Sequence, residues 1–347
     1  MTKCKGCGAE LQCEDKNSIG YVVNNEQAYC QRCFRLSHYG DTKSMYSNFV
    51  TNEKILDIYK KYSNELFVVI IDILDALVIE QDDLLELFKD YSTMLVVNKT
   101  DLMPVNMTDD KISSIFSRKL FELNRKYPKT RCAILTNKFE GAFNEQFFEV
   151  LDDLGVNRVV FAGRANAGKS SLINKLIKSD YLTTSMYPGT TLSDVEIDFG
   201  KYIFIDTPGL VDVNNYSTHL NNDKYKLSKI DKTIKPQVFQ FVDRQSYFYQ
   251  GLLRVDVIPK EKSSIIFYIN NNQEIHRTKS ENADDYYQKH YSEFDLKVKP
   301  LSEKEYSIDG EQLFVIKGLG LFKINGKCDI VVHSLSDVSV YKSEVSI

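Results

Sequence analysis

The chain has 347 residues, about twice the length of a single average domain, so the sequence predicts two or three domains. Hydrophobic residues make up 43% of it and charged residues 27%, which provides for a buried core and excludes a disordered or low-complexity protein. The formal net charge of -4 excludes a polybasic nucleic-acid binder over the whole chain, but a local basic surface is compatible with it.

The apolar segments predict a protein outside the membrane. The longest of them, from Leu66 to Ile79, contains two aspartates and is shorter than the roughly 18 residues of a membrane-spanning helix. Because residues 1–6 contain no apolar run, we expect no signal peptide. A cytoplasmic monomer with reduced cysteines and no membrane partner is therefore expected.

Four of the seven cysteines form two pairs near the N-terminus. Two residues separate the cysteines within each pair and 22 residues separate the pairs, which are Cys4 with Cys7 and Cys30 with Cys33. Two such turns supply four thiolates, a tetrahedral set that closes around Zn²⁺ and predicts a structural site. A redox dithiol or two disulfides are the alternatives. Cys13, Cys132 and Cys328 are expected to be spare cysteines.

A phosphate-binding loop is predicted between a strand over residues 158–162 and a helix over residues 169–178. Its sequence is Gly-Arg-Ala-Asn-Ala-Gly-Lys-Ser at 163–170. The glycines let backbone N–H groups turn toward phosphate oxygens, Lys169 reaches the β and γ phosphates, and the Ser170 hydroxyl ligates Mg²⁺. The expected phosphate-binding residues are Gly163, Asn166, Ala167, Gly168, Lys169, Ser170 and Ser171.

Two further motifs have the pattern of nucleotide-dependent switches. The first is Pro-Gly-Thr-Thr at 188–191; the second is Asp-Thr-Pro-Gly at 206–209, after a predicted strand pair at 195–197 and 202–205. We expect Thr191 to close on Mg²⁺, with a simple turn residue as the alternative. Asp206 is expected to hold Mg²⁺ through water, and the Gly209 N–H to sense the γ-phosphate.

The segment Asn-Lys-Thr-Asp at 98–101 follows an apolar strand at 94–97 and predicts guanine recognition. The Asp101 carboxylate accepts hydrogen bonds from the N1–H and N2–H groups of guanine, which adenine lacks. Lys99 is expected along the base, and Asn98 is expected to tie its loop to the phosphate loop. Thr136, Asn137 and Lys138 follow the next predicted strand, at 132–135, and stand where such proteins usually carry Ser-Ala-Lys, with a backbone N–H directed at guanine O6.

The order of these motifs predicts a circularly permuted nucleotide-binding domain of the α/β class. The guanine motifs come first, and the phosphate loop and the switches follow. A further strand is expected at 66–72, and helices are expected around 81–91, 108–127 and 143–154. The six strands together correspond to the sheet of a small GTPase, permuted so that the new ends of the domain fall just after the second switch.

On these motifs the chain resembles the YqeH family of circularly permuted bacterial GTPases over its whole length; His276 to Lys279 also resembles a family segment. The resemblance implies a GTPase that acts in assembly of the small ribosomal subunit, with GTP or GDP, Mg²⁺ and Zn²⁺ as cofactors. The expected domains are a zinc module at 1–48, the permuted GTPase at 49–215, and a β-rich domain at 216–347.

Catalysis is expected to be slow. Many GTPases place a glutamine after the second switch motif to orient water, whereas this chain has Leu210. Asn166 occupies the phosphate-loop position used in potassium-activated GTPases, so we expect K⁺ stimulation; a purely structural role in the loop is the alternative. The expected catalytic residues are Lys169, Asn166, Thr191 and Gly209. A GTP-dependent RNA-binding or ribosome-binding scaffold with negligible turnover is the alternative function.

The C-terminal third is predicted to be β-rich and to contact RNA. It begins with lysines at positions 224, 226, 229, 232 and 235, and continues in alternating apolar runs. Arg254, His276, Arg277 and Lys279 could extend the basic surface, although a solvated charged helix is the alternative for the lysines. Asn325 and Gly326 predict the type I′ turn of a hairpin over residues 321–331.

Overall fold

The computed structural model describes residues 2–24, 26–39, 50–136, 140–184, 190–220, 225, 228–290, 301–345 and 347. The chain forms two compact units. The first comprises Met1–Asp72, Asp82–Thr100 and Phe116–Val211, and the second comprises Ile73–Gln81, Asp101–Ile115 and Asp212–Ile347. Two segments that follow strands of the first unit, Ile73–Gln81 and Asp101–Ile115, therefore belong to the second. Within the described ranges, no helix is long and apolar enough to cross a membrane.

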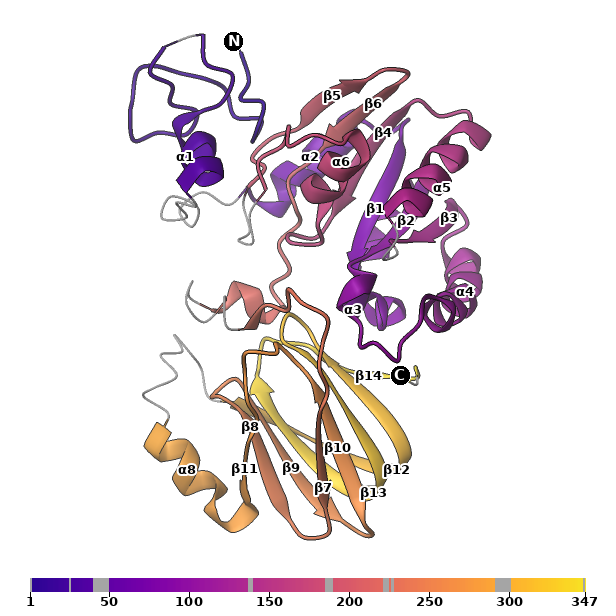
Figure 1. The fold of residues 1–347 in the computed structure, drawn as a ribbon, viewed down its shortest axis with the longest axis vertical. Coiled ribbons are helices and arrows are strands. Elements are labelled where there is room, and N and C mark those ends of the chain that lie inside the picture. Colours follow the sequence, from indigo (N-terminus) through magenta and orange to yellow (C-terminus); the bar gives the residue numbers. More distant parts are fainter. Residues whose placement is uncertain are drawn as a thin grey trace. The chain divides into compact units, whose positions relative to one another are not determined.

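The first unit is built on a six-stranded sheet in the order β3-β2-β1-β4-β6-β5 (Figure 1). Its strands are β1 (Leu66–Asp72), β2 (Thr93–Asn98), β3 (Thr130–Leu135), β4 (Arg158–Gly163), β5 (Val195–Phe199) and β6 (Tyr202–Asp206). All neighbours are parallel except β5 and β6, which form an antiparallel pair. The six strands expected from the sequence are thereby confirmed.

The strand order confirms the circular permutation. β1 pairs with β2 on one side and with β4, the strand before the phosphate loop, on the other, although 85 residues separate the end of β1 from the start of β4. The guanine-motif strands therefore lie on one side of β1 and the switch strands on the other. Because the carboxyl ends of parallel strands share one edge of a sheet, this arrangement gathers the motif loops of the unit along that edge.

Helices cover both faces of this sheet. α5 (Glu140–Asp153) and α6 (Lys169–Ile177) contribute Phe147 and Ile173 to a core with Val68 and Phe161 of the sheet. On the other face, Tyr59 of α2 (Asn52–Lys61) packs edge-on against Phe67 of β1. Successive residues of a strand point to opposite faces, so the continuous apolar sequence of β1 is what a sheet buried on both sides requires.

The α-helix expected around residues 81–91 is absent. The structure has two short 3-10 segments instead, η1 (Ile79–Gln81) and η2 (Leu84–Phe88). The carboxylate of Asp82 accepts a hydrogen bond from the Leu84 backbone N–H at 2.8 Å and pairs with Arg164. A side chain that satisfies the local backbone in this way competes with a continuous helix. The helix expected at 108–127 is present as α4 (Asp109–Lys126).

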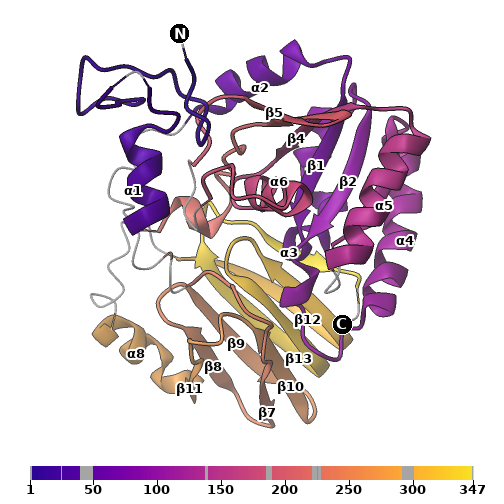
Figure 2. The ribbon, with the colours of Figure 1, turned by 45° about the horizontal axis from the view of Figure 1, so that its top comes forward.

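The described residues of the N-terminal segment of the first unit include the helix α1 (Gln31–Tyr39) and short bridges such as the one between Lys3 and Glu10. Its small core consists of the paired cysteines, Ala9 and partly buried neighbours. In Figure 2 these N-terminal loops lie beside the segment that leads into β5, and the Leu192 N–H donates a hydrogen bond to the Cys7 carbonyl at 2.7 Å. This segment therefore packs on the switch side of its own unit.

The second unit contains an eight-stranded antiparallel sheet, which confirms the β-rich prediction. β11, β8, β9, β13, β10 and β7 follow one another, and β12 pairs with β13 and β14. The strands are β7 (Gln237–Phe241), β8 (Gln245–Tyr249), β9 (Leu253–Pro259), β10 (Ser263–Tyr268), β11 (His276–Lys279), β12 (Leu301–Ile316), β13 (Gly320–Leu335) and β14 (Val340–Ser343). Helical elements among the described residues of this unit include α3 (Ile73–Ala76), η1, η4 (Tyr216–Thr218), η5 (Ser280–Asn282) and α8 (Ala283–His290).

The prediction of a hairpin that turns at Asn325 and Gly326 is wrong. Both residues lie inside β13, and Gly326 is opposite Gly310 of β12 in the register. β13 changes its second partner near this point, from β10 to β9, and Gly326 has φ +117° with no room for a side chain beside Ser263. The glycine therefore serves a change of strand partner, and the actual turn lies at residues 317–319.

The lysine stretch before β7 is only partly described, because Lys224 and Lys226 lie outside the described residues. The described part at 229–235 is irregular, and Lys232 and Lys235 are exposed. The alternative prediction of a solvated helix is therefore wrong for residues 229–235.

Candidate functional site

The phosphate loop connects β4 to α6 and depends on a left-handed backbone. Gly168 has φ +97°, and a β-carbon there would lie 2.3 Å from Asn98 Nδ2. Asn98, at the end of β2, donates from Nδ2 to the carbonyl oxygen of Ala167 at 2.8 Å. Glycine at 168 thus permits the contact between the guanine motif and the phosphate loop that the sequence predicted.

The Lys169 side chain is buried under this loop. Its Nζ donates to the carbonyl oxygens of Gly163 at 3.3 Å and Arg164 at 3.0 Å. Burial lowers the pKa of Lys169 to about 8, although the nearby Asp206 carboxylate acts in the opposite direction. The ammonium group is therefore held by two carbonyl oxygens at the beginning of the phosphate loop, near the N-terminus of α6, which favours anions.

Three oxygen-bearing side chains meet beside the loop. Asp206 Oδ2 accepts hydrogen bonds from Ser170 Oγ at 2.8 Å and from Thr191 Oγ1 at 2.9 Å. Asp206 is fully buried, which raises the pKa of its carboxyl group. Its Oδ1 atom has no hydrogen-bond partner among the described residues. A buried carboxylate oxygen without a partner, next to two hydroxyl groups, fits the hard oxygen ligands of Mg²⁺.

The second switch lies against the phosphate loop. Leu210 N donates to Gly163 O at 3.0 Å, and Ala165 N donates to Leu210 O at 2.8 Å. A β-carbon at Gly209 would lie 2.5 Å from the Ala165 Cα, so the close approach requires glycine. The Leu210 side chain is buried and apolar, so it cannot orient a water molecule.

The phosphate loop and both switches line one pocket. Of the predicted residues, Asn166, Gly168, Lys169, Ser170, Ser171, Thr191 and Gly209 line it. Sequence reasoning missed four further lining residues, which are Ala165, Thr184, Thr190 and Thr207. The last two stand within the switch motifs themselves, so their position next to Thr191 and Asp206 was the available signal.

The guanine motif crosses from the first unit to the second after Thr100. In the first unit, Lys99 has φ +64° and its Nζ pairs with Asp72 Oδ2 at 2.6 Å. Sequence reasoning missed Asp72, which ends β1 opposite Asn98 as the polar terminus of an apolar strand. In the second unit, the Asp101 carbonyl accepts a hydrogen bond from Thr233 Oγ1 at 2.9 Å.

The structure describes only part of the second guanine motif and of the first switch motif. Thr136 is buried, and its N–H donates to Val97 O at 2.9 Å, so it continues from β3 beside β2. Asn137 and Lys138 lie outside the described residues, as do Pro188 and Gly189 of the first switch motif.

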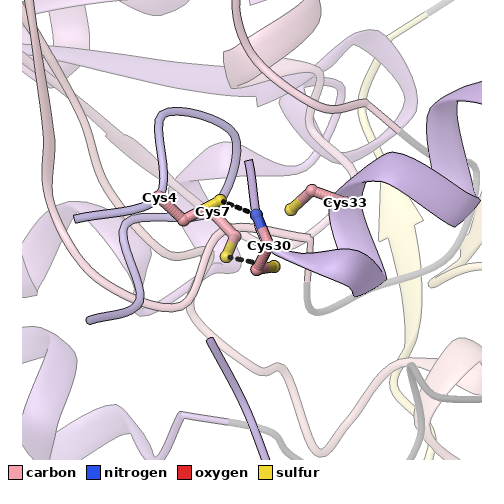
Figure 3. Close-up of side chains that lie close together, drawn as sticks. All are labelled: Cys4, Cys7, Cys30 and Cys33. Atoms are coloured by element: carbon pink, nitrogen blue, oxygen red, sulfur yellow. Dashed lines mark hydrogen bonds between the residues drawn. The ribbon is translucent and has the colours of Figure 1, made fainter. Parts of the chain in front are cut away.

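The four paired cysteines come together as predicted (Figure 3). Their Sγ atoms all lie within 4.8 Å of one another and are buried. Cys7 Sγ lies 3.8 Å from Cys30 Sγ, close to the edge of about 3.8 Å that a tetrahedron with metal–sulfur bonds of about 2.3 Å requires. The Cys30 N–H donates to Cys4 Sγ at 3.2 Å. Hydrogen bonds from neighbouring thiols, first of all Cys30, lower the pKa of Cys4. This all-sulfur set fits a structural zinc ion.

The three remaining cysteines lie apart from this cluster. Cys13 is exposed, Cys132 is half-buried and Cys328 is buried; none of them belongs to the group of potential metal ligands.

Comparison with known proteins identifies the family. A family model described as "YqeH-like, C-terminal" matches residues 262–344. The YqeH protein of Bacillus subtilis (strain 168) is 32% identical over 361 aligned positions, which cover 98% of this chain and 93% of that protein. The chain belongs to the YqeH family. The family resemblance inferred from the motifs is thereby confirmed.

Other relatives of this YqeH-family chain match it more distantly or over shorter segments. NO-associated protein 1 of Arabidopsis thaliana is 24% identical, and the alignment covers 82% of this chain and 60% of that protein. GTPase Der of Legionella pneumophila (strain Corby) is 31% identical over 33% of this chain and 26% of that protein.

A second family model, described as "50S ribosome-binding GTPase", matches residues 158–282 of the YqeH-family chain. The match starts at β4, so it includes the phosphate loop and both switches and leaves the guanine motif upstream. This is what permutation of a GTPase domain produces. The chain is a GTP-binding protein of the GTPase class.

Proposed function

We propose that this protein is a Mg²⁺-dependent, K⁺-stimulated GTPase switch in assembly of the small ribosomal subunit. The observation that supports the hydrolytic part best is the buried Asp206 carboxylate with hydroxyls of Ser170 and Thr191 on one oxygen and no described partner on the other. After hydrolysis the first switch loses its contacts with the γ-phosphate, and we expect this loss to favour release of Thr191.

Each predicted site residue has a role in this proposal. Lys169 and the loop amides bind the β and γ phosphates, while Ser170, Thr191 and Asp206 hold Mg²⁺, which neutralises phosphate charge when bound. Gly209 senses the γ-phosphate through its N–H. Guanine is recognised by Asn98, Lys99, Asp101 and the segment Thr136, Asn137 and Lys138.

Zn²⁺ is the proposed ion of the four-cysteine cluster. Four buried thiolates leave no open position for substrate, so this ion stabilises the N-terminal segment without entering the chemistry. The predicted domain limits, at 48/49 and 215/216, remain part of the proposal.

RNA contact is proposed for the edge of the second unit at β11. His276, Arg277 and Lys279 are exposed on this edge strand, and the His276 ring stacks on Tyr286 at a centroid distance of 3.9 Å. Cationic groups beside a stacked aromatic pair suit a phosphate backbone with accessible bases. The basic Lys232 and Lys235 before β7 support the same partner class.

Co-sedimentation tests the ribosomal role. The chain, loaded with GTP, GDP or a non-hydrolysable GTP analogue, is centrifuged with purified small and large ribosomal subunits. Binding to small subunits that depends on the nucleotide supports the proposal. Binding only to large subunits, which the description of the second family model would favour, contradicts the small-subunit assignment, and binding to neither contradicts a ribosomal role.

A scaffold with negligible turnover is the second candidate, favoured by the buried, apolar Leu210 in place of a water-orienting residue. Turnover with and without small subunits in K⁺ separates the two functions. A rate that stays at the uncatalysed level under all conditions supports the scaffold.

Potassium stimulation rests on Asn166, which lines the phosphate pocket with φ +64°. If its side chain helps to hold K⁺ beside the phosphates, turnover in KCl exceeds turnover in NaCl of equal concentration by on the order of tenfold, since one positioned cation stabilises transition-state charge. Asn166→Ala is expected to abolish the difference between the two salts. Equal wild-type rates in the two salts contradict potassium activation.

A further inference from the structure

The four-cysteine segment holds the first switch by its main chain. The carbonyl oxygen of Cys7, one of the four clustered cysteines, accepts hydrogen bonds from the N–H groups of Leu192 at 2.7 Å and Ser193 at 3.1 Å. Leu192 also packs against the cysteine cluster. The backbone directly after Thr191 is therefore fixed to a metal-ligand residue.

Arg32, in the first turn of α1, holds the backbone on the other side of Thr191. Its guanidinium donates to the Thr190 carbonyl oxygen at 2.6 Å, and the side chain is partly buried. Hydrogen bonds from a charged donor are stronger than neutral ones. Thr191, enclosed by these contacts, is the residue whose hydroxyl donates to Asp206.

Two glycines allow the approach. At Gly8, φ is +76° and a β-carbon would lie 2.6 Å from the Ser193 carbonyl oxygen. At Gly6, a β-carbon would lie 2.2 Å from Thr183 Oγ1. Both glycines border Cys7, so the turn that carries this cysteine is also the surface that meets the switch.

We propose that Arg32 and the Cys7 carbonyl are positioning groups for GTP hydrolysis. They hold residues 190–193 so that Thr191 stays at the Asp206 carboxylate, which makes the four-cysteine segment a part of the hydrolytic apparatus. The inference rests on the proposed function, because it takes Thr191 as a group that closes on Mg²⁺. GDP, which lacks the γ-phosphate, does not require a closed first switch.

Arg32→Ala tests the inference. Loss of a charged hydrogen bond of this kind is expected to lower kcat about 10- to 100-fold. GDP affinity should remain within about twofold because the phosphate loop is untouched. Hydrogen exchange at the Leu192 and Ser193 amides should become faster. Arg32→Lys should restore part of kcat, since an ammonium group can donate to the same carbonyl.

Arg35→Ala is the matched control, because Arg35 is exposed on the same helix. It should leave kcat and both amides unchanged. The inference is overturned if Arg32→Ala retains the wild-type kcat and amide protection.

A second pair of variants is used if Arg32→Ala loses its metal ion. Bound zinc is measured in Arg32→Ala, and if the zinc content is reduced, Gly6→Ala tests the positioning role in its place. Its new methyl group would lie 2.2 Å from Thr183 Oγ1 and 3.2 Å from Cys33 Sγ, so bound zinc is measured in this variant too. With zinc retained, displacement of Thr183 should lower kcat, and the double variant Gly6→Ala/Thr183→Ala should recover it. A Gly6→Ala protein with wild-type kcat, or no recovery in the double variant, overturns the inference.

Thr191→Ala separates failure of the inference from failure of the proposed function. If wild-type turnover needs no Mg²⁺, or Thr191→Ala hydrolyses GTP at the wild-type rate, the proposed function is wrong at this site. If Thr191→Ala is inactive while Arg32→Ala is fully active, only the positioning role fails.

Discussion

Asp101→Asn is expected to weaken GTP binding by about 10²- to 10⁴-fold, since two hydrogen bonds to a charged acceptor contribute about 1.5–3 kcal/mol each. The asparagine amide would place a donor against the N1–H and N2–H donors of guanine. Xanthine carries a carbonyl oxygen in place of the N2 amino group, so xanthosine triphosphate should bind the variant better than GTP does. Equilibrium titration with GTP, xanthosine triphosphate and ATP measures the change in preference.

The structure makes this substitution a clean test of base recognition. Asp101 is exposed, and its backbone carbonyl is held by Thr233 while the Leu102 carbonyl accepts from the Ile234 N–H at 2.9 Å. These contacts do not involve the side chain that changes, so the fold should be retained. Asp110→Asn, an exposed change on α4, is the control. Unchanged GTP affinity in Asp101→Asn would refute the base-recognition role.

The sequence was sufficient where local chemistry determines structure. Apolar runs that end in a polar motif residue, such as β2 with Asn98, predicted the strands of the sheet and their functional ends. Motif order then predicted the permutation, because the pairing of β1 with β4 follows once the phosphate loop is known to lie downstream of the guanine motif.

The errors arose where distant residues decide local structure. Asp82 bonds to the local backbone in place of a helix and is also paired with Arg164, 82 residues away. Asn325 and Gly326 do not form a turn because both pair with β12, and Asn325 also pairs with Ser264 of β10. The contacts of Cys7 and Arg32 with the first switch likewise join residues more than 150 positions apart, and spacing along the chain gives no indication of them.

The second unit begins directly after the second switch with a buried ion pair. Lys317 Nζ lies 2.6 Å from Asp212 Oδ2, and the two side chains are 1% and 6% exposed. The same carboxylate accepts the Asn214 N–H at 3.0 Å, and the Lys317 carbonyl accepts the Tyr216 N–H at 3.0 Å. Asp212 follows Gly209 by three residues, so this pair fixes the start of the second unit just after the second switch motif in the sequence.

Lys317→Met is expected to destabilise the second unit by about 3–5 kcal/mol, because it leaves a buried carboxylate without its cation. Chemical denaturation measures the loss as a lower transition midpoint of that unit. Lys327→Met is the control: Lys327 pairs with Asp309 at 2.9 Å, but with 50% and 78% of the side chains exposed, so its removal should cost at most about 1 kcal/mol. Combining Lys317→Met with Asp212→Leu should recover much of the stability, since no buried charge is then left alone. Equal costs for the two lysine substitutions would show that desolvation does not govern the Asp212 pair.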